Sequence, residues 1–161
     1  MSKHVGRALP DDLLERLSAR DLAALADRVI VVCSVDDRGF PHPALLSYFE
    51  VLATDSRTIR LAMYATSRTV ANVRRDGRLT LILVDARVAY YVKGTARVLA
   101  DAMRATPYNA KLDLQIEEVL ADEANPELEP GAYIASGITY VNPRRAEELE
   151  RAQQVLSEIH E

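Results

Sequence analysis

The sequence Thr66-Ser67-Arg68-Thr69-Val70-Ala71-Asn72 follows a segment that predicts a strand, 58–65, and begins a segment that predicts a short helix, 66–76. A hydroxyl at its start can cap the helix, and Gly77 can end it. The first N–H groups of a helix have no partners within it, so hydroxyls and an arginine on the same turn make a donor set suited to phosphate. A capped helix with a solvated Arg68 explains the same residues, because most capped helices bind no anion.

Around this turn, the apolar patterns predict a run of strands flanked by helices. The expected strands are 29–35, 40–52, 58–65, 79–85, 88–99 and 112–116, with a further candidate at 138–141. The first is apolar enough to suggest burial on both faces, and Gly94 suggests a bulge. Helices are expected from Pro10, from Ser18 and from Asn142, and in the last of these Glu147 and Arg151 are spaced to pair on its outer face.

The order of elements predicts an α+β, mainly β protein whose antiparallel sheet closes into a barrel. We expect a single domain over residues 1–161, with N-terminal helices at 1–27, the barrel at 28–141 and a C-terminal helix at 142–161. The net charge of −4 argues against a nucleic-acid or anionic-membrane partner. The chain has no membrane-length apolar run and no signal-like start, so the expected compartment is the cytoplasm.

Three stretches, in this order, resemble the pyridoxamine 5'-phosphate oxidase-like FMN-binding split β-barrels. They are 31–42, which resembles an opening hairpin, 66–81, which is similar to a phosphate-binding helix running into a strand, and 91–98, which resembles a glycine-containing strand. The resemblance implies a six-stranded antiparallel split β-barrel with short flanking helices. It also implies a homodimer with FMN at the subunit interface, acting as an oxidoreductase on a small-molecule substrate.

The resemblance carries over to particular residues of this chain. It implies that Ser67, Arg68 and Thr69 hold the phosphate, that Ala62 and Met63 line the ring or ribityl chain, and that the backbone around His42–Ser47 passes the isoalloxazine. The full set of implied cofactor residues is His42, Ala44, Leu45, Ser47, Ala62, Met63, Ser67, Arg68, Thr69 and Asn72. Thr69 stands where the oxidase has a second cation, and the oxidase's C-terminal arginine motif is missing. These departures indicate a broader family member rather than the true oxidase.

Other cofactors in the same groove are alternatives. A deazaflavin has an acidic tail that Arg57, Arg60, Arg74 and Arg75 could meet, and haem would need an axial ligand such as His42. A non-catalytic flavin- or small-ligand-binding protein, for instance a stress or regulatory module, is the third alternative. No catalytic acid, base or nucleophile stands out, and the three histidines with one cysteine have no metal-site spacing.

Overall fold

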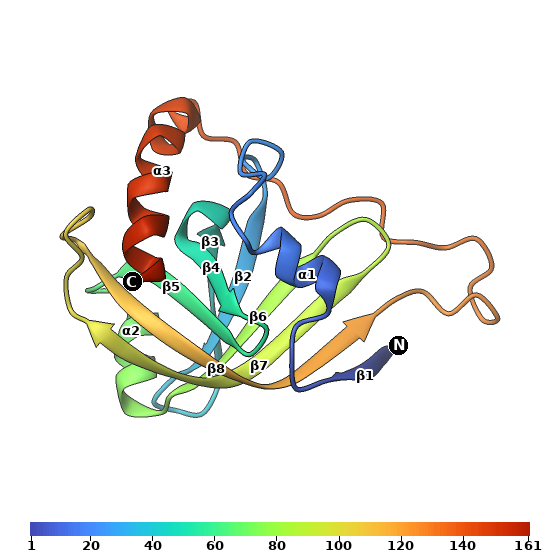
Figure 1. Ribbon diagram of the computed structural model, residues 1–161. Coiled ribbons are helices and arrows are strands. Elements are labelled where there is room, and N and C mark those ends of the chain that lie inside the picture. Colours follow the sequence, from blue (N-terminus) through green and yellow to red (C-terminus); the bar gives the residue numbers. More distant parts are fainter.

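Eight strands form one antiparallel sheet that curls around a core in the computed structural model, which describes residues 1–161 (Figure 1). The strands are β1 (Ser2–Gly6), β2 (Val29–Val35), β3 (Pro41–Ser47), β4 (Val51–Asp55), β5 (Thr58–Tyr64), β6 (Arg78–Val84), β7 (Ala89–Ala100) and β8 (Asn109–Asp122). The helices are α1 (Asp11–Arg16), the 3₁₀ turn η1 (Tyr48–Glu50), α2 (Arg68–Arg75) and α3 (Arg145–His160). The predicted class, a mainly β split barrel with few helices, is confirmed.

The sheet is split where its two edge strands meet. The strand order is β3-β2-β6-β7-β8-β5-β4, with β1 added to β8. The edges β3 and β4 follow one another in the chain and are joined only by η1. The curled sheet therefore brings its edges together at η1 without a hydrogen-bonded ladder between them, and this gap is where the cavity described below lies.

The expected number of six strands was too low for two reasons. The segment 40–52 is divided by η1, because the Ser47 N–H and Oγ both donate to Glu50 Oε2 at 3.0 Å and turn the chain. The polar segment Ser2–Gly6 gives no apolar pattern, yet it pairs with β8 as β1. The expected strand 112–116 is the middle of the longer β8.

Two prolines lie on the edge strand β3, where a missing N–H breaks no ladder. Because proline cannot donate, Pro41 and Pro43 occupy positions that are not hydrogen-bonded to β2. Such positions alternate along an antiparallel pair, so Leu45 and Ser47 also occupy positions that are not hydrogen-bonded to β2. Their N–H groups therefore point to the open edge of the sheet.

The N-terminal segment departs from expectation after α1. Leu13 and Leu17 are fully buried, as an amphipathic helix requires, but the second helix expected from Ser18 is absent and this part of the prediction is wrong. Ser18 Oγ donates back to the Glu15 carbonyl at 2.6 Å instead of capping a new helix. Ala19 has a φ of 62°, which ends the helical path.

The other strand predictions fare unevenly. β2 has the expected bounds, but residues such as Val31 and Cys33 are only half-buried. The prediction that this strand is buried on both faces is therefore wrong for the single chain. Gly94 does mark a register shift, and a Cβ there would stand 2.0 Å from the Gln115 carbonyl oxygen. The candidate strand 138–141 is reduced to one isolated bridge between Arg28 and Thr139.

The helix α3 covers part of the outer face of the barrel through a second apolar core (Figure 1). This core consists of Phe49, Leu52, Ala62 and Met103 from the barrel side and Ala152, Val155, Leu156 and Ile159 from α3. Cations bind the carbonyls at its C-terminal end: Arg60 donates to Ile159 at 3.0 Å, and Lys111 donates to Glu158 at 2.8 Å. None of the helices is long and apolar enough to cross a membrane.

Candidate functional site

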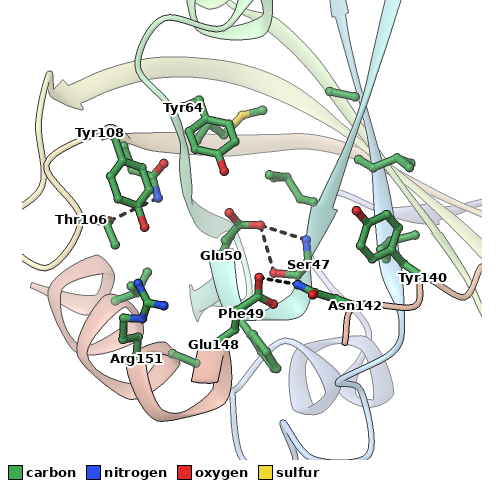
Figure 2. Close-up of a pocket in the computed structure, with 18 of the residues that line it drawn as sticks. Ser47, Phe49, Glu50, Tyr64, Thr106, Tyr108, Tyr140, Asn142, Glu148 and Arg151 are labelled. Carbon is green, nitrogen blue, oxygen red and sulfur yellow. Dashed lines mark hydrogen bonds between the residues drawn. The ribbon is translucent and has the colours of Figure 1, made fainter. Parts of the chain in front are cut away.

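A cavity of about 420 Å³ opens at the split of the barrel, between β3, β5, the β7–β8 loop and α3 (Figure 2). Its volume is in the range of small-molecule sites. We call one group of lining residues the phosphate end: Ala44, Leu45, Met63, Ser67 and Thr69. We call another group the α3 end: Phe49, Glu50, Tyr140, Asn142, Arg145, Glu148, Arg151, Ala152 and Val155.

Six of the residues implied by the sequence line this cavity, namely Ala44, Leu45, Ser47, Met63, Ser67 and Thr69. The other four lie elsewhere. Ala62 faces the core beneath α3, because neighbouring residues of a strand point to opposite faces. His42 is half-buried further along β3, and Arg68 is exposed. Asn72 is buried and donates to Ser34 Oγ at 2.9 Å, so its amide is used inside the barrel.

The N-terminus of α2 is capped and still has unpaired donors. Ser67 Oγ accepts from the Val70 N–H at 3.2 Å, and the Ser67 carbonyl accepts from the Ala71 N–H at 3.2 Å. The N–H groups of Arg68 and Thr69 have no partner in the chain, and neither does the Arg68 guanidinium. A cap and an anion site are therefore compatible at this turn.

Glu50 lies at the centre of the view into the cavity (Figure 2). Its Oε2 accepts both bonds from Ser47, and its other carboxylate oxygen has no partner in the chain. Burial raises the pKa of Glu50 above its ordinary value, and the negative Glu148 adds to this rise. The Ser47 bonds and the positive Arg145 lower the pKa by less than burial raises it.

The α3 side of the cavity has an ion pair of its own. Arg145 donates to Glu148 at 2.6 Å, and the Asn142 amide donates to the other Glu148 oxygen at 2.7 Å. The Arg145 guanidinium lies 5.2 Å from the ring centre of Phe49 and 5.8 Å from that of Tyr140. Arg145 and Glu148 therefore form an ion pair, while Arg145 Nε is buried without a hydrogen-bond partner.

Arg151 was expected to pair with Glu147, and that prediction is wrong. Glu147 pairs with Arg144 at 2.8 Å instead. Arg151 turns to the cavity and has no hydrogen bond or ion pair in the chain (Figure 2). The spacing of four residues allowed the pair, but Arg144 just before the helix is closer to Glu147.

The β7–β8 loop forms a buried polar pair with the start of β8 and an aromatic rim with the end of β5. Thr106 and Asn109 are 5% and 4% exposed, and the Asn109 amide donates to Thr106 Oγ1 at 3.2 Å. Asn109 Oδ1 is buried without a partner. The rings of Tyr64 and Tyr108 lie 5.7 Å apart and are both exposed, so they form an apolar rim (Figure 2).

The sequence had one usable signal for the residues that were missed. Ser47 and Glu50 have the spacing of a capping box, which could have located η1 and its carboxylate inside the apolar segment 40–52. Asn109 and Arg151 had no such signal, because their position depends on how the β7–β8 loop and α3 pack around the split.

Comparisons with known proteins agree on the fold. Residues 19–136 match the protein family described as Pyridoxamine 5'-phosphate oxidase. The Bacillus subtilis (strain 168) protein YclD is 32% identical over 85 residues, which are 53% of this chain and 55% of YclD. The match thus spans about half of the length of that curated relative.

Two solved structures show the same fold at low identity. A Lactobacillus delbrueckii protein, provisionally assigned as a pyridoxamine 5'-phosphate oxidase, is 20% identical, with a TM-score of 0.58 over 73% of this chain and 98% of its own. The Mycobacterium tuberculosis protein Rv2991 is 13% identical, with a TM-score of 0.55 over 83% of this chain and 98% of its own. At these identities the likeness concerns the fold alone.

The family match contains β2 to β8 and α2, which together form most of the barrel and the phosphate end of the cavity. It stops before α3, so the helix that closes the other end lies outside it. With well over half of its residues matched, the chain belongs to the pyridoxamine 5'-phosphate oxidase-like family of split β-barrels.

Proposed function

We propose that this protein binds FMN and uses it as an oxidoreductase on a small-molecule substrate. The observation that carries the proposal is the N-terminus of α2 at the rim of the cavity. It has two unpaired N–H groups, the free Arg68 guanidinium and the Thr69 hydroxyl, which makes no hydrogen bond within the chain. These donors at the positive end of a helix fit a phosphate monoester.

The rest of the phosphate end fits the remainder of the cofactor. The Leu45 N–H points to the open edge of β3, where it can donate to a polar ring edge. Ala44 and Met63 offer apolar contacts in the same cavity. FMN supplies the hydride-transfer chemistry when bound, and these residues orient it and exclude water from it.

A homodimer that covers the cofactor is part of the proposal. Leu45, Tyr64 and Tyr108 are 56%, 64% and 53% exposed around the cavity, and a second copy would bury them. The size of the protein in solution tests this part. A monomer that still binds FMN tightly would contradict the interface site.

The alternative cofactors find less support in the geometry. For a deazaflavin, Arg57 does not line the cavity and Arg60 is engaged with α3. Arg74 pairs with Asp101, and Arg75 bonds to Val35 and Asn72. For haem, His42 does not line the cavity. A non-catalytic flavin protein would share the FMN site, and reduction of bound FMN by a pyridine nucleotide or another donor would separate it from an enzyme.

The deciding experiment compares FMN with riboflavin, which lacks the phosphate. The purified protein is stripped of any cofactor and titrated with each, following the loss of flavin fluorescence. We expect FMN to bind much more tightly than riboflavin, because the donors of α2 meet only the phosphate. Equal affinity for the two, or no binding of FMN, would refute the proposed site.

A further inference from the structure

We propose that Glu50 is the proton-transfer residue of the cavity, and that its free carboxylate oxygen exchanges a proton with a neutral substrate that carries a hydroxyl group. The inference rests on the proposed function, because this substrate would lie beside the bound flavin. In the direction of oxidation, the substrate C–H bond breaks and its hydride passes to FMN. The O–H bond also breaks, its proton passes to Glu50 Oε1, and a C=O bond forms. The substrate is thereby oxidised and FMN reduced, and the reverse step returns the proton.

The first argument is the way the carboxylate is held. The Ser47 N–H and Oγ both donate to Glu50 Oε2 at 3.0 Å, so this oxygen is fixed at the edge of β3. The other oxygen, Oε1, has no hydrogen-bond partner and is open to the cavity (Figure 2). A carboxylate with one anchored and one free oxygen accepts a proton from a defined direction, as a general base must.

The second argument is the place of Glu50 relative to the proposed flavin site. The N–H groups of Leu45 and Ser47 both point to the open edge of β3, and two residues of a strand span about 7 Å. The Leu45 N–H is the donor proposed for the polar edge of the flavin ring, and the Ser47 N–H holds Glu50. The carboxylate is therefore anchored on the same edge, within reach of a small molecule that lies against the ring.

The third argument is that the other titratable side chains of the cavity wall do not suit this role. They are Tyr64, Tyr108, Tyr140, Arg145, Glu148 and Arg151. Phenol and guanidinium groups hold their own protons near neutral pH and so do not accept another. Glu148 has both oxygens occupied, one by Arg145 and the other by Asn142. No histidine or cysteine lines the cavity, which leaves Glu50.

The charges around Glu50 fit a neutral substrate. The α3 end contains two carboxylates, of Glu50 and Glu148, and two guanidiniums, of Arg145 and Arg151, so an ionic ligand would add a charge without a counterpart. Ala152 gives apolar contact for the carbon part of the substrate. Burial also raises the pKa of Glu50 above its ordinary value, toward the range in which a carboxyl group both gives and takes a proton near neutral pH.

The test of proton transfer measures the midpoint potential of bound FMN against pH. Reduction adds negative charge beside Glu50, so the carboxylate should take up a proton together with the electrons. Each proton that accompanies two electrons steepens the profile by about 30 mV per pH unit. We expect this steeper region in the native protein and in the control Glu150→Gln, at an exposed α3 glutamate without a partner in the chain. It should be absent in Glu50→Gln, and a native profile in that variant would overturn the proposal.

Ser47→Ala provides an independent variant. It removes the hydroxyl donor that favours the charged carboxylate, so the steeper region should move to higher pH. An unmoved profile would overturn the part assigned to Ser47.

An FMN titration before reduction separates this inference from the proposed function. If the native protein did not bind FMN, the proposed function would fail and the inference would fall with it. If Glu50→Gln bound FMN with native affinity and also kept the native profile, the inference alone would fail.

The substrate class is tested by isothermal titration calorimetry on the FMN-loaded protein with benzyl alcohol, benzylammonium and benzoate. We expect the neutral alcohol to bind more than about tenfold more tightly than either ion. Tighter binding of an ion, or no detectable binding of the alcohol, would overturn the assignment of a neutral substrate.

Discussion

The two ends of the cavity differ in chemistry. The phosphate end presents donors: the amides of Arg68 and Thr69 at the start of α2, and the Leu45 N–H at the edge of β3. The α3 end presents carboxylates and guanidiniums together with an aromatic surface, and much of it comes from a helix outside the family match. Under the proposed function, the barrel would bind the cofactor and the added helix would set what lies beside it. The two properties can then change independently.

The strongest way to break this comparison is to loosen α3 alone. Ile159→Ala removes a fully buried side chain from the α3 core and should lower the free energy of unfolding by about 2–5 kcal/mol in urea denaturation. FMN affinity should be unchanged if the ends are independent, and a parallel loss would show that they are coupled. Leu128→Ala, at a side chain that is 79% exposed, is the control and should leave stability unchanged.

The phosphate end is tested by Arg68→Ala. The loss of one charged hydrogen bond costs about 1.5–3 kcal/mol of binding free energy. The affinity for FMN should therefore fall by roughly tenfold to a hundredfold in a fluorescence titration. The free energy of unfolding should hardly change, because Arg68 is exposed and unpaired. Arg74→Ala, at the other end of the same helix, removes the same charge and should retain FMN affinity. Equal losses in both variants would indicate a general effect of charge rather than a phosphate contact.

The contrast also marks what the sequence could predict. The phosphate end follows from local rules, since a strand, a hydroxyl cap and a glycine stop are all visible within 58–77. The bounds of β2, β5 and α2 follow from the same kind of pattern. Among the strands around the site, the division of 40–52 at η1 and the start of β8 at Asn109 were missed.

The α3 end could not be predicted, because it exists only after folding. Glu50 and Arg151 are far apart in the chain, and both line the cavity only after the sheet has curled and α3 has packed against it. Whether Arg151 faces solvent or the cavity depends on how α3 is rotated against the barrel, and that rotation is fixed by Leu156 and Ile159 in the second core. Polar residues at such a position carry no periodic signal.

A smaller effect is expected from Glu50→Gln on stability. Because the folded pKa of Glu50 is raised above its ordinary value of 4.5, the folded state holds the proton more strongly than the unfolded state. The stability that this provides is complete below the ordinary value and is lost as pH rises through the raised pKa. Glutamine does not titrate, so the variant should be more stable than the native protein by about 1 kcal/mol at mildly alkaline pH.

This advantage should shrink as the pH falls toward the ordinary value, which urea denaturation across the pH range would measure. A variant less stable than the native protein at alkaline pH would show that Glu50 already has a cationic partner in the chain.

The smallest change is expected from Arg151→Ala. Arg151 has no partner in the chain, so its removal should alter the free energy of unfolding by less than about 0.5 kcal/mol. Thermal unfolding beside the native protein is a sufficient measurement. A clear loss that disappears in a Glu50→Gln background would show that the two side chains pair in solution, and the α3 end would then be neutral without a ligand.

The prolines of β3 have a consequence beyond the cavity. An exposed edge strand is a template on which another chain can add a strand and begin aggregation. Pro41 and Pro43 remove the N–H from two of the outward positions, and the Ser47 N–H is already taken by Glu50. An incoming strand would find a single outward donor, at Leu45, where a continuous row is needed. The open edge can thus offer a hydrogen bond to a small molecule while resisting edge-to-edge association of its own copies.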